Sequence, residues 1–434
     1  MSKTHIKNVH ARRVWNTQGH PTVEVEITLR YGAVGRAVAP IRALTHLPAD
    51  EKAPAPDNFD LIAMIDHING EVRSLLKGVR VDEQQEIDRR LLDLKDTDFF
   101  WHVGENILIA VSMAVQKAAA ACEKLPLWQY LGTLQGESEA NTLPLPEVPI
   151  FSRGPYFSRK VDVQDFMVIA VGASSYAEAL EWTADVFRAA RNIKRDSGLP
   201  IDNTLAGDER SAFENNEDVL ETLTRAIEES GHRPGEDIAI SLDVAASNFG
   251  FNGHYNMISN PELNSDHLSG MIIDWLARFP IVSITDPLGD DDQIGMVRFT
   301  WAVSKRTQVV GDQFFMPRSE LIEHAAKDGA CNAVQINPAR SSTLSQCKAL
   351  FNAAQVANFG SIIAAGANQT EHEMIMHLGV GWGVKQIKTA KFTQSGGTCV
   401  GNEGVRIAES IALSVGGSLP ADGNLPPKSA FPWG

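Results

Sequence analysis

The sequence predicts a two-part α/β protein in which an α+β unit of roughly 140 residues precedes a parallel βα barrel. The chain has 434 residues, which is too long for one small core and favours two or three domains. Its first part joins a half-buried strand to a run of helices, whereas its second part alternates short apolar strands with helices. The Pro-rich segment Leu143–Pro149 separates the two patterns and marks the predicted boundary, which gives domains of residues 1–140 and 141–434.

The first part is predicted from one alternating segment and three helical ones. Thr22–Leu29 alternates apolar and polar residues, as a strand with one solvent-facing side does. Residues 50–58 combine charge, Pro and Ala, which is typical of an exposed loop. Helices are then predicted over Leu61–Leu76, Asp82–Leu94 and Glu105–Glu123. Strands followed by helices define an α+β unit.

The second part is predicted to hold six strands, each followed by a helix. Before them come two helices: Ser175 and Glu178 form a capping box for the first, and Glu217–Ser230, closed by Gly231, is the second. The strands are Ile238–Leu242, Ile281–Ile284, Thr307–Val310, Ala333–Ile336, Ser361–Ala364 and Lys385–Lys388. The later helices are expected near 265–279, 292–305, 318–327, 342–357, 370–378 and 402–415. This number of strands favours closure into a barrel over an open sheet.

Composition places the chain among ordinary globular proteins and narrows its partners. Hydrophobic residues make up 43% and charged residues 21% of the chain. The net charge of −15 argues against nucleic acid or an anionic membrane as a partner. The longest apolar run, Ile107–Cys122, is interrupted by Gln116 and Lys117 and is too short to cross a bilayer. With no secretion signal and four scattered cysteines, we expect a cytoplasmic protein without a disulfide frame or a zinc cluster.

Polar residues end most of the predicted strands. They are Asp243, Thr285 with Asp286, Asp312, Asn337 and Lys388, while Ala365 ends the remaining strand. Because the loops at the C-terminal ends of barrel strands meet at one mouth, these side chains are expected to lie together. Carboxylates that converge from different strands are typical ligands of Mg²⁺, and a lysine opposite them can act as an acid, a base or an anion clamp. The alternative is that the Asp residues only cap the next loop or helix.

Segments along nearly the whole chain resemble the enolase (phosphopyruvate hydratase) family. In the first part they are Gly19–Glu26, Val111–Ala120 and Leu143–Pro146. In the second part they are Gln164–Met167, Val171–Ser175, Gly207–Glu209, Asp243–Ser247, Asp286–Pro287, Val310–Asp312, Gln386–Thr389 and Arg406–Glu409. The resemblance implies an N-terminal α+β cap domain on a modified (β/α)8 TIM-type barrel with the order ββαα(βα)6, which accounts for the paired helices before the regular units. It also implies a cytoplasmic homodimer that interconverts 2-phosphoglycerate and phosphoenolpyruvate with two Mg²⁺ ions.

The resemblance places one Mg²⁺ ion at three strand ends. Asp243 and Asp312 match two of the carboxylate ligands. The third ligand, a Glu before Asp-Pro, is matched by Thr285, whose neutral hydroxyl removes one full charge and should weaken the site. Asp286 is next to it, but neighbouring residues of a strand point to opposite faces, so Asp286 should not replace the missing ligand. We therefore expect a weak or partial Mg²⁺ site.

The residues for proton transfer match the family only in part. Glu209 matches the general acid, and Asp165 matches a second active-site Glu with a side chain one methylene shorter. Lys388 matches the lysine that contacts the substrate carboxylate, and Gln164 is a further predicted substrate contact. The general base of the family is a lysine that is matched here by Gln335, and a glutamine cannot take a proton from a carbon acid.

The predicted phosphate site differs most from the family. A Ser-His-Arg-Ser run is matched by residues 364–367, which read Ala-Ala-Gly-Ala, so the guanidinium and both hydroxyls are absent. The lid that supplies a ligand to the second metal is matched by Ile41–His46, and a catalytic-loop His by Tyr156. Arg340 and Arg210 are cations that could bind a differently placed substrate anion, although both are also typical of solvated loops.

These differences predict an enolase-family protein that dehydrates 2-phosphoglycerate poorly. It is either a Mg²⁺-dependent lyase that acts on another small carboxylate-bearing acid, or a non-catalytic paralogue that keeps a homodimeric fold for binding or regulation. The retained Asp243, Asp312, Glu209 and Lys388 favour some chemistry, although buried charges are also kept where they neutralise one another. The remaining alternative is a working phosphopyruvate hydratase of glycolysis.

Overall fold

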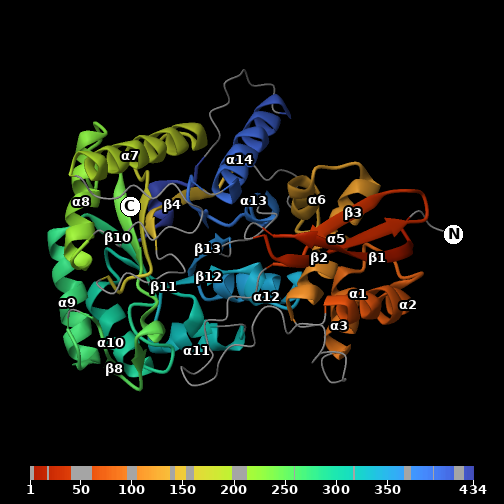
Figure 1. Cartoon of the computed structure of the whole chain (residues 1–434), viewed down its shortest axis with the longest axis horizontal. Coiled ribbons are helices and arrows are strands. Elements are labelled where there is room, and N and C mark those ends of the chain that lie inside the picture. The colour runs from red at the N-terminus through yellow and green to blue at the C-terminus, as the bar shows by residue number, and fades with distance from the viewer. Residues whose placement is uncertain are drawn as a thin grey trace. The chain divides into compact units, whose positions relative to one another are not determined.

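The chain forms two compact units, which are described from a computed structural model (Figure 1). The structure describes residues 4–16, 19–40, 61–94, 105–136, 142–152, 161–197, 213–258, 260–315, 318–365, 373–393, 395–414 and 425–434. The first unit contains Met1–Ala140 together with Asn337–Leu350 and Ala364–Trp382, and the second contains the remaining segments. No helix within the described ranges is long and apolar enough to cross a membrane.

The first unit is built on an antiparallel sheet of three strands in the order β1-β2-β3. The strands are β1 (Ile6–Trp15), β2 (Pro21–Leu29) and β3 (Val34–Val38). β2 contains the alternating segment predicted as a strand, and it packs against helix α5 (Glu105–Glu123), whose bounds are those predicted. The helix comes close to the sheet at Gly35, where a Cβ would lie only 2.2 Å from the carbonyl oxygen of Ala114.

Helices complete the first unit. They are α1 (Leu61–His67), η2 (Ile68–Val72), α2 (Arg73–Leu76), α3 (Gln84–Asp93), α6 (Leu127–Thr133) and α13 (Glu373–Trp382). The single helix predicted over residues 61–76 contains a π-helical turn, η2, which the spacing of apolar residues does not reveal. α13 packs on α6 at Gly381, where a Cβ would lie 2.5 Å from the Cβ of Leu131.

The second unit is a closed barrel whose described strands follow the order β10-β11-β12-β13-β14-β4-β5-β6. The strands are β4 (Leu145–Ser152), β5 (Asp165–Ile169), β6 (Ala239–Asp243), β10 (Ile281–Thr285), β11 (Gln308–Gly311), β12 (Ala333–Ile336), β13 (Gly360–Ala364) and β14 (Gln386–Lys388). The six strands predicted from their apolar runs all form within one residue of the expected bounds. The TIM-type barrel is therefore confirmed.

Two features of the barrel go beyond the six strands predicted from their apolar runs. Leu143–Pro149, which follows the start of the second unit at Asn141, contains most of β4, and β5 runs antiparallel to both β4 and β6. Two prolines hide β4 from sequence analysis, since proline has no N–H to donate to a neighbouring strand. The strand accommodates the second of them with a register shift between Pro149 and Phe151. The ββ opening is the one that the family resemblance implies.

The helices of the second part follow the predicted alternation. They are α7 (Tyr176–Asp196), α8 (Asn216–Glu229), α9 (Ser265–Arg278), α10 (Gln293–Val303), α11 (Glu320–Asp328), α12 (Leu344–Val356) and α14 (Ser395–Ser414). Ser175 caps α7 by accepting a hydrogen bond of 3.2 Å from the backbone N–H of Glu178. The carboxylate of Glu178 accepts from the backbone N–H of Ser174 at 2.6 Å, so the return bond of the capping box is displaced by one residue.

The end of the barrel where the parallel strands begin is closed by apolar side chains. Leu145 and Ala239, at the starts of β4 and β6, cluster with Ile169 and Phe431. The ring of Phe431 stacks on that of Trp433, with 4.6 Å between the ring centroids. Residues 425–434 thus form the floor of the barrel, and its polar side chains lie nearer the other end.

Candidate functional site

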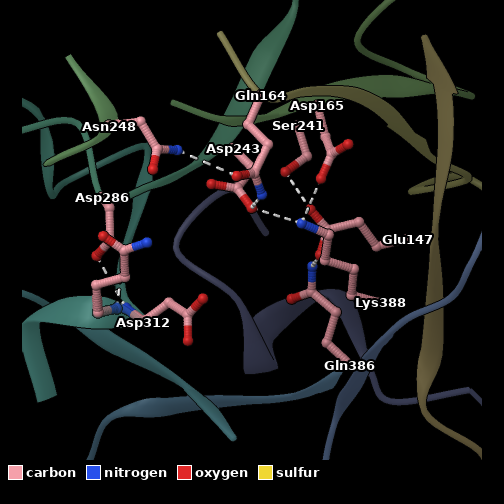
Figure 2. Close-up of polar contacts among 11 residues, drawn as sticks. Glu147, Gln164, Asp165, Ser241, Asp243, Asn248, Asp286, Asp312, Gln386 and Lys388 are labelled. Atoms are coloured by element: carbon pink, nitrogen blue, oxygen red, sulfur yellow. Dashed lines mark hydrogen bonds and ion pairs between the residues drawn. The ribbon is translucent and has the colours of Figure 1, made fainter. Parts of the chain in front are cut away.

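The barrel mouth holds a buried ammonium group between two carboxylates (Figure 2). The Nζ of Lys388 donates to Oδ2 of Asp243 at 2.6 Å and to Oδ2 of Asp165 at 2.8 Å. The side chains of Lys388 and Asp243 are only 9% and 3% exposed. The structure therefore brings together three of the residues singled out from the sequence, and it does so through direct ion pairs.

Strand direction explains why these residues meet. Asp243 and Lys388 end the strands β6 and β14, which β4 and β5 separate in the sheet, so their bond crosses the barrel interior. Asp165 begins β5, but β5 runs antiparallel, and this places its first residue at the edge where the parallel strands end. The register agrees, because Asp165 lies opposite Asp243.

Burial and charge compete over the protonation of this triad. Burial lowers the pKa of Lys388, but Asp165 and Asp243 outweigh it and hold the pKa well above its ordinary value. Burial alone would raise the pKa of Asp165. The charge and hydrogen bond of the Lys388 ammonium act in the opposite direction, and the net result is a lowered pKa. The pKa of Asp243 is raised by burial, which Lys388 offsets only in part. Lys388 is thus fixed in its charged form and is unable to act as a base at neutral pH.

Gln164, a predicted substrate contact, is turned toward the same carboxylate. Its Nε2 donates to Oδ2 of Asp243 at 3.0 Å, and its Oε1 accepts from Nδ2 of Asn248 at 3.3 Å. Asn248 belongs to the turn η4 (Ala246–Asn248) that follows β6. The Oδ2 atom of Asp243 therefore receives hydrogen bonds from both Gln164 and Lys388.

A second polar layer lies below the triad, and sequence analysis missed it. Glu147 on β4 is buried and accepts from Oγ of Ser241 and, at 3.1 Å, from Nε2 of Gln386. Burial raises the pKa of Glu147, while Ser241 and Lys388 act against this increase. The available signal was a charged residue inside an otherwise apolar segment, but the prolines beside it concealed the strand.

A further lysine, Lys391, was also missed. It follows β14, is buried, and its Nζ lies 3.5 Å from the carbonyl oxygen of Ser152. Its charge contributes to the lowered pKa of Asp165. The mouth therefore contains two buried lysines that act on the same carboxylate.

The three predicted metal ligands end neighbouring strands, but they differ in charge. Thr285 pairs in register with Asp243 on one side and with Val310 on the other, so its side chain shares the interior face with Asp243. Asp312 follows β11 and acts electrostatically on Asp243. The position nearest to Asp243 on β10 is thus held by a neutral hydroxyl.

Asp286 does not take over the role of a ligand at this position. Its backbone φ of 42° turns the chain after β10, and its two carboxylate oxygens accept from the backbone N–H groups of Asp312 (2.9 Å) and Gln313 (2.8 Å). Burial and the charge of Asp312 raise its pKa to about 8, against these two hydrogen bonds. Asp286 therefore caps the turn after β11, which agrees with the expectation that it cannot replace a ligand.

The donor set at the mouth does not fit a Mg²⁺ ion well. Among the described residues, no group of three or more His, Cys, Asp or Glu side chains is arranged to hold a metal. Mg²⁺ requires near-octahedral oxygen ligands at about 2.0–2.1 Å. Here Asp243 is bound by an ammonium group, and Thr285 offers an uncharged oxygen.

Gln335 occupies the interior face of β12. Val310 lies on the inner face of β11 and is paired in register with Ala333, so Ala333 also faces the barrel interior. Gln335 is two positions later on β12 and therefore shares that face. Gln335 is buried, and its Oε1 has no hydrogen-bond partner among the described residues. A buried amide oxygen without a donor costs about 1–3 kcal/mol, so this atom favours a ligand or a water that can donate to it.

The other predicted site residues lie outside the described residues or in a segment of the first unit. Glu209, Arg210, Tyr156 and Ile41–His46 lie outside the described residues, as do residues 366 and 367. Arg340 lies in the turn η6 (Pro338–Arg340), within a segment of the first unit. Its contact with a substrate stays a prediction.

A closed barrel with charged side chains gathered where its parallel strands end defines a TIM-barrel protein with its polar site at the usual mouth. A family model described as enolase, C-terminal TIM barrel domain, matches residues 140–416, and one described as enolase, N-terminal domain, matches residues 6–131. The chain therefore belongs to the enolase family, whose members generally use Mg²⁺.

Proposed function

We propose that this enolase-family protein does not interconvert 2-phosphoglycerate and phosphoenolpyruvate at a useful rate, and that its barrel mouth binds another small hydroxy acid. Gln335 carries this proposal. It stands on the inner face of β12 where the resemblance implies the lysine that removes a proton from carbon. An amide has no basic nitrogen, and a positioned general base contributes about 10²–10⁴-fold to such a reaction.

Lys388, the lysine that ends β14, does not supply the missing base. Lys388 is held in its charged form by Asp165 and Asp243. The metal that would stabilise an enolate intermediate would also be bound more weakly, because Thr285 replaces one of its carboxylate ligands. Both losses affect the same step, the removal of a proton next to a carboxylate.

The class of ligand follows from the groups that line the mouth. The Oε1 of Gln335, which has no partner among the described residues, is placed to accept a hydrogen bond from a hydroxyl group of a ligand. Lys391 adds a buried positive charge next to Asp165, which favours a ligand that carries a carboxylate. Together these groups suit a hydroxy acid, acted on by a lyase or bound without turnover. The homodimeric assembly and the cytoplasmic location implied by the resemblance are part of this proposal.

The test is a spectrophotometric assay of phosphoenolpyruvate formation from 2-phosphoglycerate with excess Mg²⁺, run beside an ordinary enolase. We expect a rate at least about 10³-fold below that of the control enzyme. Asp243→Asn is assayed in parallel, because an equal residual rate in both proteins would reveal a contaminating enolase of the expression host. A rate within about tenfold of the control, lost in Asp243→Asn, would show a working phosphopyruvate hydratase.

A double variant separates the base from the phosphate site. Thr285→Glu with Gln335→Lys restores the metal ligand and the base that the resemblance implies, but residues 364–367 still offer no group that binds phosphate. We expect this variant to remain inactive toward 2-phosphoglycerate. Recovery of the activity by these two changes alone would show that phosphate is bound elsewhere.

A further inference from the structure

The position of Lys388 has a consequence for metal binding that does not depend on the ligand of the mouth. Its ammonium group lies 2.6 Å from Oδ2 of Asp243 and 2.8 Å from Oδ2 of Asp165. Each oxygen is a hard donor of the kind that a divalent cation binds. Lys388 therefore donates a hydrogen bond to the carboxylate of Asp243, which the resemblance assigns as a ligand of Mg²⁺.

We propose that the ammonium group of Lys388 replaces a divalent cation at Asp243, so that this barrel mouth is held together without Mg²⁺. The lysine is an internal cation that cannot dissociate, and a chelator cannot remove it. The mouth then keeps its arrangement at any concentration of divalent metal, whereas a metal-dependent mouth would loosen when the metal is removed.

Distance supports this replacement. A Mg²⁺ ion bound to Oδ2 of Asp243 at about 2.1 Å would lie no farther than about 5 Å from an ammonium nitrogen that is 2.6 Å from the same oxygen. The two cations would repel each other in a site shielded from water, where such repulsion is stronger than at the surface. Gln164 further occupies that oxygen with its own hydrogen bond of 3.0 Å.

Charge supports it as well. Asp165, Asp243 and Asp312 bring three carboxylates to the mouth, and Lys388 and Lys391 bring two positive charges, which is the charge of one Mg²⁺ ion. A carboxylate at position 285 would have made a third ligand beside Asp243, but the residue is Thr285. The mouth has thus lost one metal ligand and holds two buried lysines.

The experiment measures metal binding instead of catalysis. Mn²⁺ binding to the purified full chain is followed by electron paramagnetic resonance, and the melting temperature is recorded in 10 mM MgCl₂ and in EDTA. For the unchanged protein we expect no Mn²⁺ binding with a Kd below about 1 mM, and a melting temperature that differs by no more than about 1 °C between the two solutions. Tight Mn²⁺ binding that disappears in Asp243→Asn would overturn the proposal.

Lys388→Met provides the decisive comparison, with Lys388→Arg as its charge-conserving control. The methionine variant leaves Asp165 and Asp243 without their cation, so its melting temperature should fall, and MgCl₂ should raise it by several degrees. The arginine variant should not respond to MgCl₂. A methionine variant that responds no more than the unchanged protein would contradict the proposal. If that variant does not fold in EDTA, recovery of soluble protein in MgCl₂ supports the proposal; without recovery, the Mn²⁺ measurement on the unchanged protein decides.

Discussion

The two sides of the barrel interior differ sharply in chemistry. On the side of β14, β4, β5 and β6, the side chains form a charged network centred on Lys388, with Glu147 below it. On the side of β11, β12 and β13, the interior is an apolar cluster of Val310, Ala333 and Ile362. On the first side burial strengthens ion pairs, whereas on the second side it serves mainly the packing of apolar side chains.

This difference predicts how each side of the barrel interior responds to substitution. An apolar cluster tolerates changes that conserve volume, whereas a buried ion pair loses stability when either partner is removed. Polar side chains also occur on the apolar side: Gln308 of β11 is buried and bonded to Ser283, and Gln335 has a buried amide oxygen without a partner among the described residues. The following changes test the contrast, beginning with the largest expected effect.

Truncating the apolar side should cost the most among these variants. Ile362→Ala removes a fully buried side chain from the cluster with Val310 and Ala333, and such changes cost about 2–5 kcal/mol. The midpoint of urea unfolding should fall, by the same amount in MgCl₂ and in EDTA. A loss below about 1 kcal/mol would mean that this side is loosely packed and that the contrast between the two sides is weaker than described.

Glu147→Gln tests the polar side through its pH dependence. Burial raises the pKa of Glu147 in the folded protein, so folding favours the protonated acid. The stability that this proton contributes is present below the unfolded pKa of about 4.3 and is lost as the pH rises through the folded value. As the pH rises above the unfolded value, the unchanged protein should therefore lose stability relative to the variant, which has no titrating group at this position.

The measurement for Glu147 is urea unfolding of both proteins at several pH values. The new amide can still accept from Ser241, and it can donate to Oε1 of Gln386, which has no partner among the described residues. Parallel curves for the two proteins would show that Glu147 stays ionised in the fold, contrary to this expectation.

Gln335→Met should give the smallest change and one of opposite sign. The methionine removes a buried amide oxygen without a partner, so we expect stability to rise by about 1 kcal/mol in the absence of ligand. Gln386→Met is the matched control: it replaces the same residue type on another barrel strand but breaks the bond from Nε2 to Glu147, and it should lower the urea midpoint. If Gln335→Met is also destabilising, its amide already has a donor in the free protein.

Sequence analysis predicted the elements whose periodicity is strong. α5 and β12 have the expected bounds, because each is a predominantly apolar run without proline. β4 was missed since Pro146 and Pro149 are typical of loops, and only its place beside β5 and β14 makes it a strand. The π-helical turn η2 is likewise set by packing and has no local signal.

The site was predictable only in its outline. The strand ends identified Asp243, Thr285, Asp312 and Lys388, because polar residues after apolar strands are conspicuous. The sequence is compatible with an ion pair between Lys388 and Asp243 but does not determine it, since the pair depends on which side chains reach across the barrel. Glu147 lies in a strand that the prolines conceal, and its burial follows only from closure of the barrel.

The pairing of β14 with β4 sets an order of events during folding. Gln386 and Glu147 are bonded although 239 positions separate them in the chain, and Asp243 is 145 positions from Lys388. Loop-closure entropy makes such distant contacts slow to form, and they are made late. A chain emerging from the ribosome therefore exposes the edges of β4 and β13 until β14 arrives, and during that interval Glu147 and Asp243 lack the partners that later bury them. The strand that closes the barrel thus also carries Gln386 and Lys388, so closure and the assembly of the charged mouth depend on the same segment.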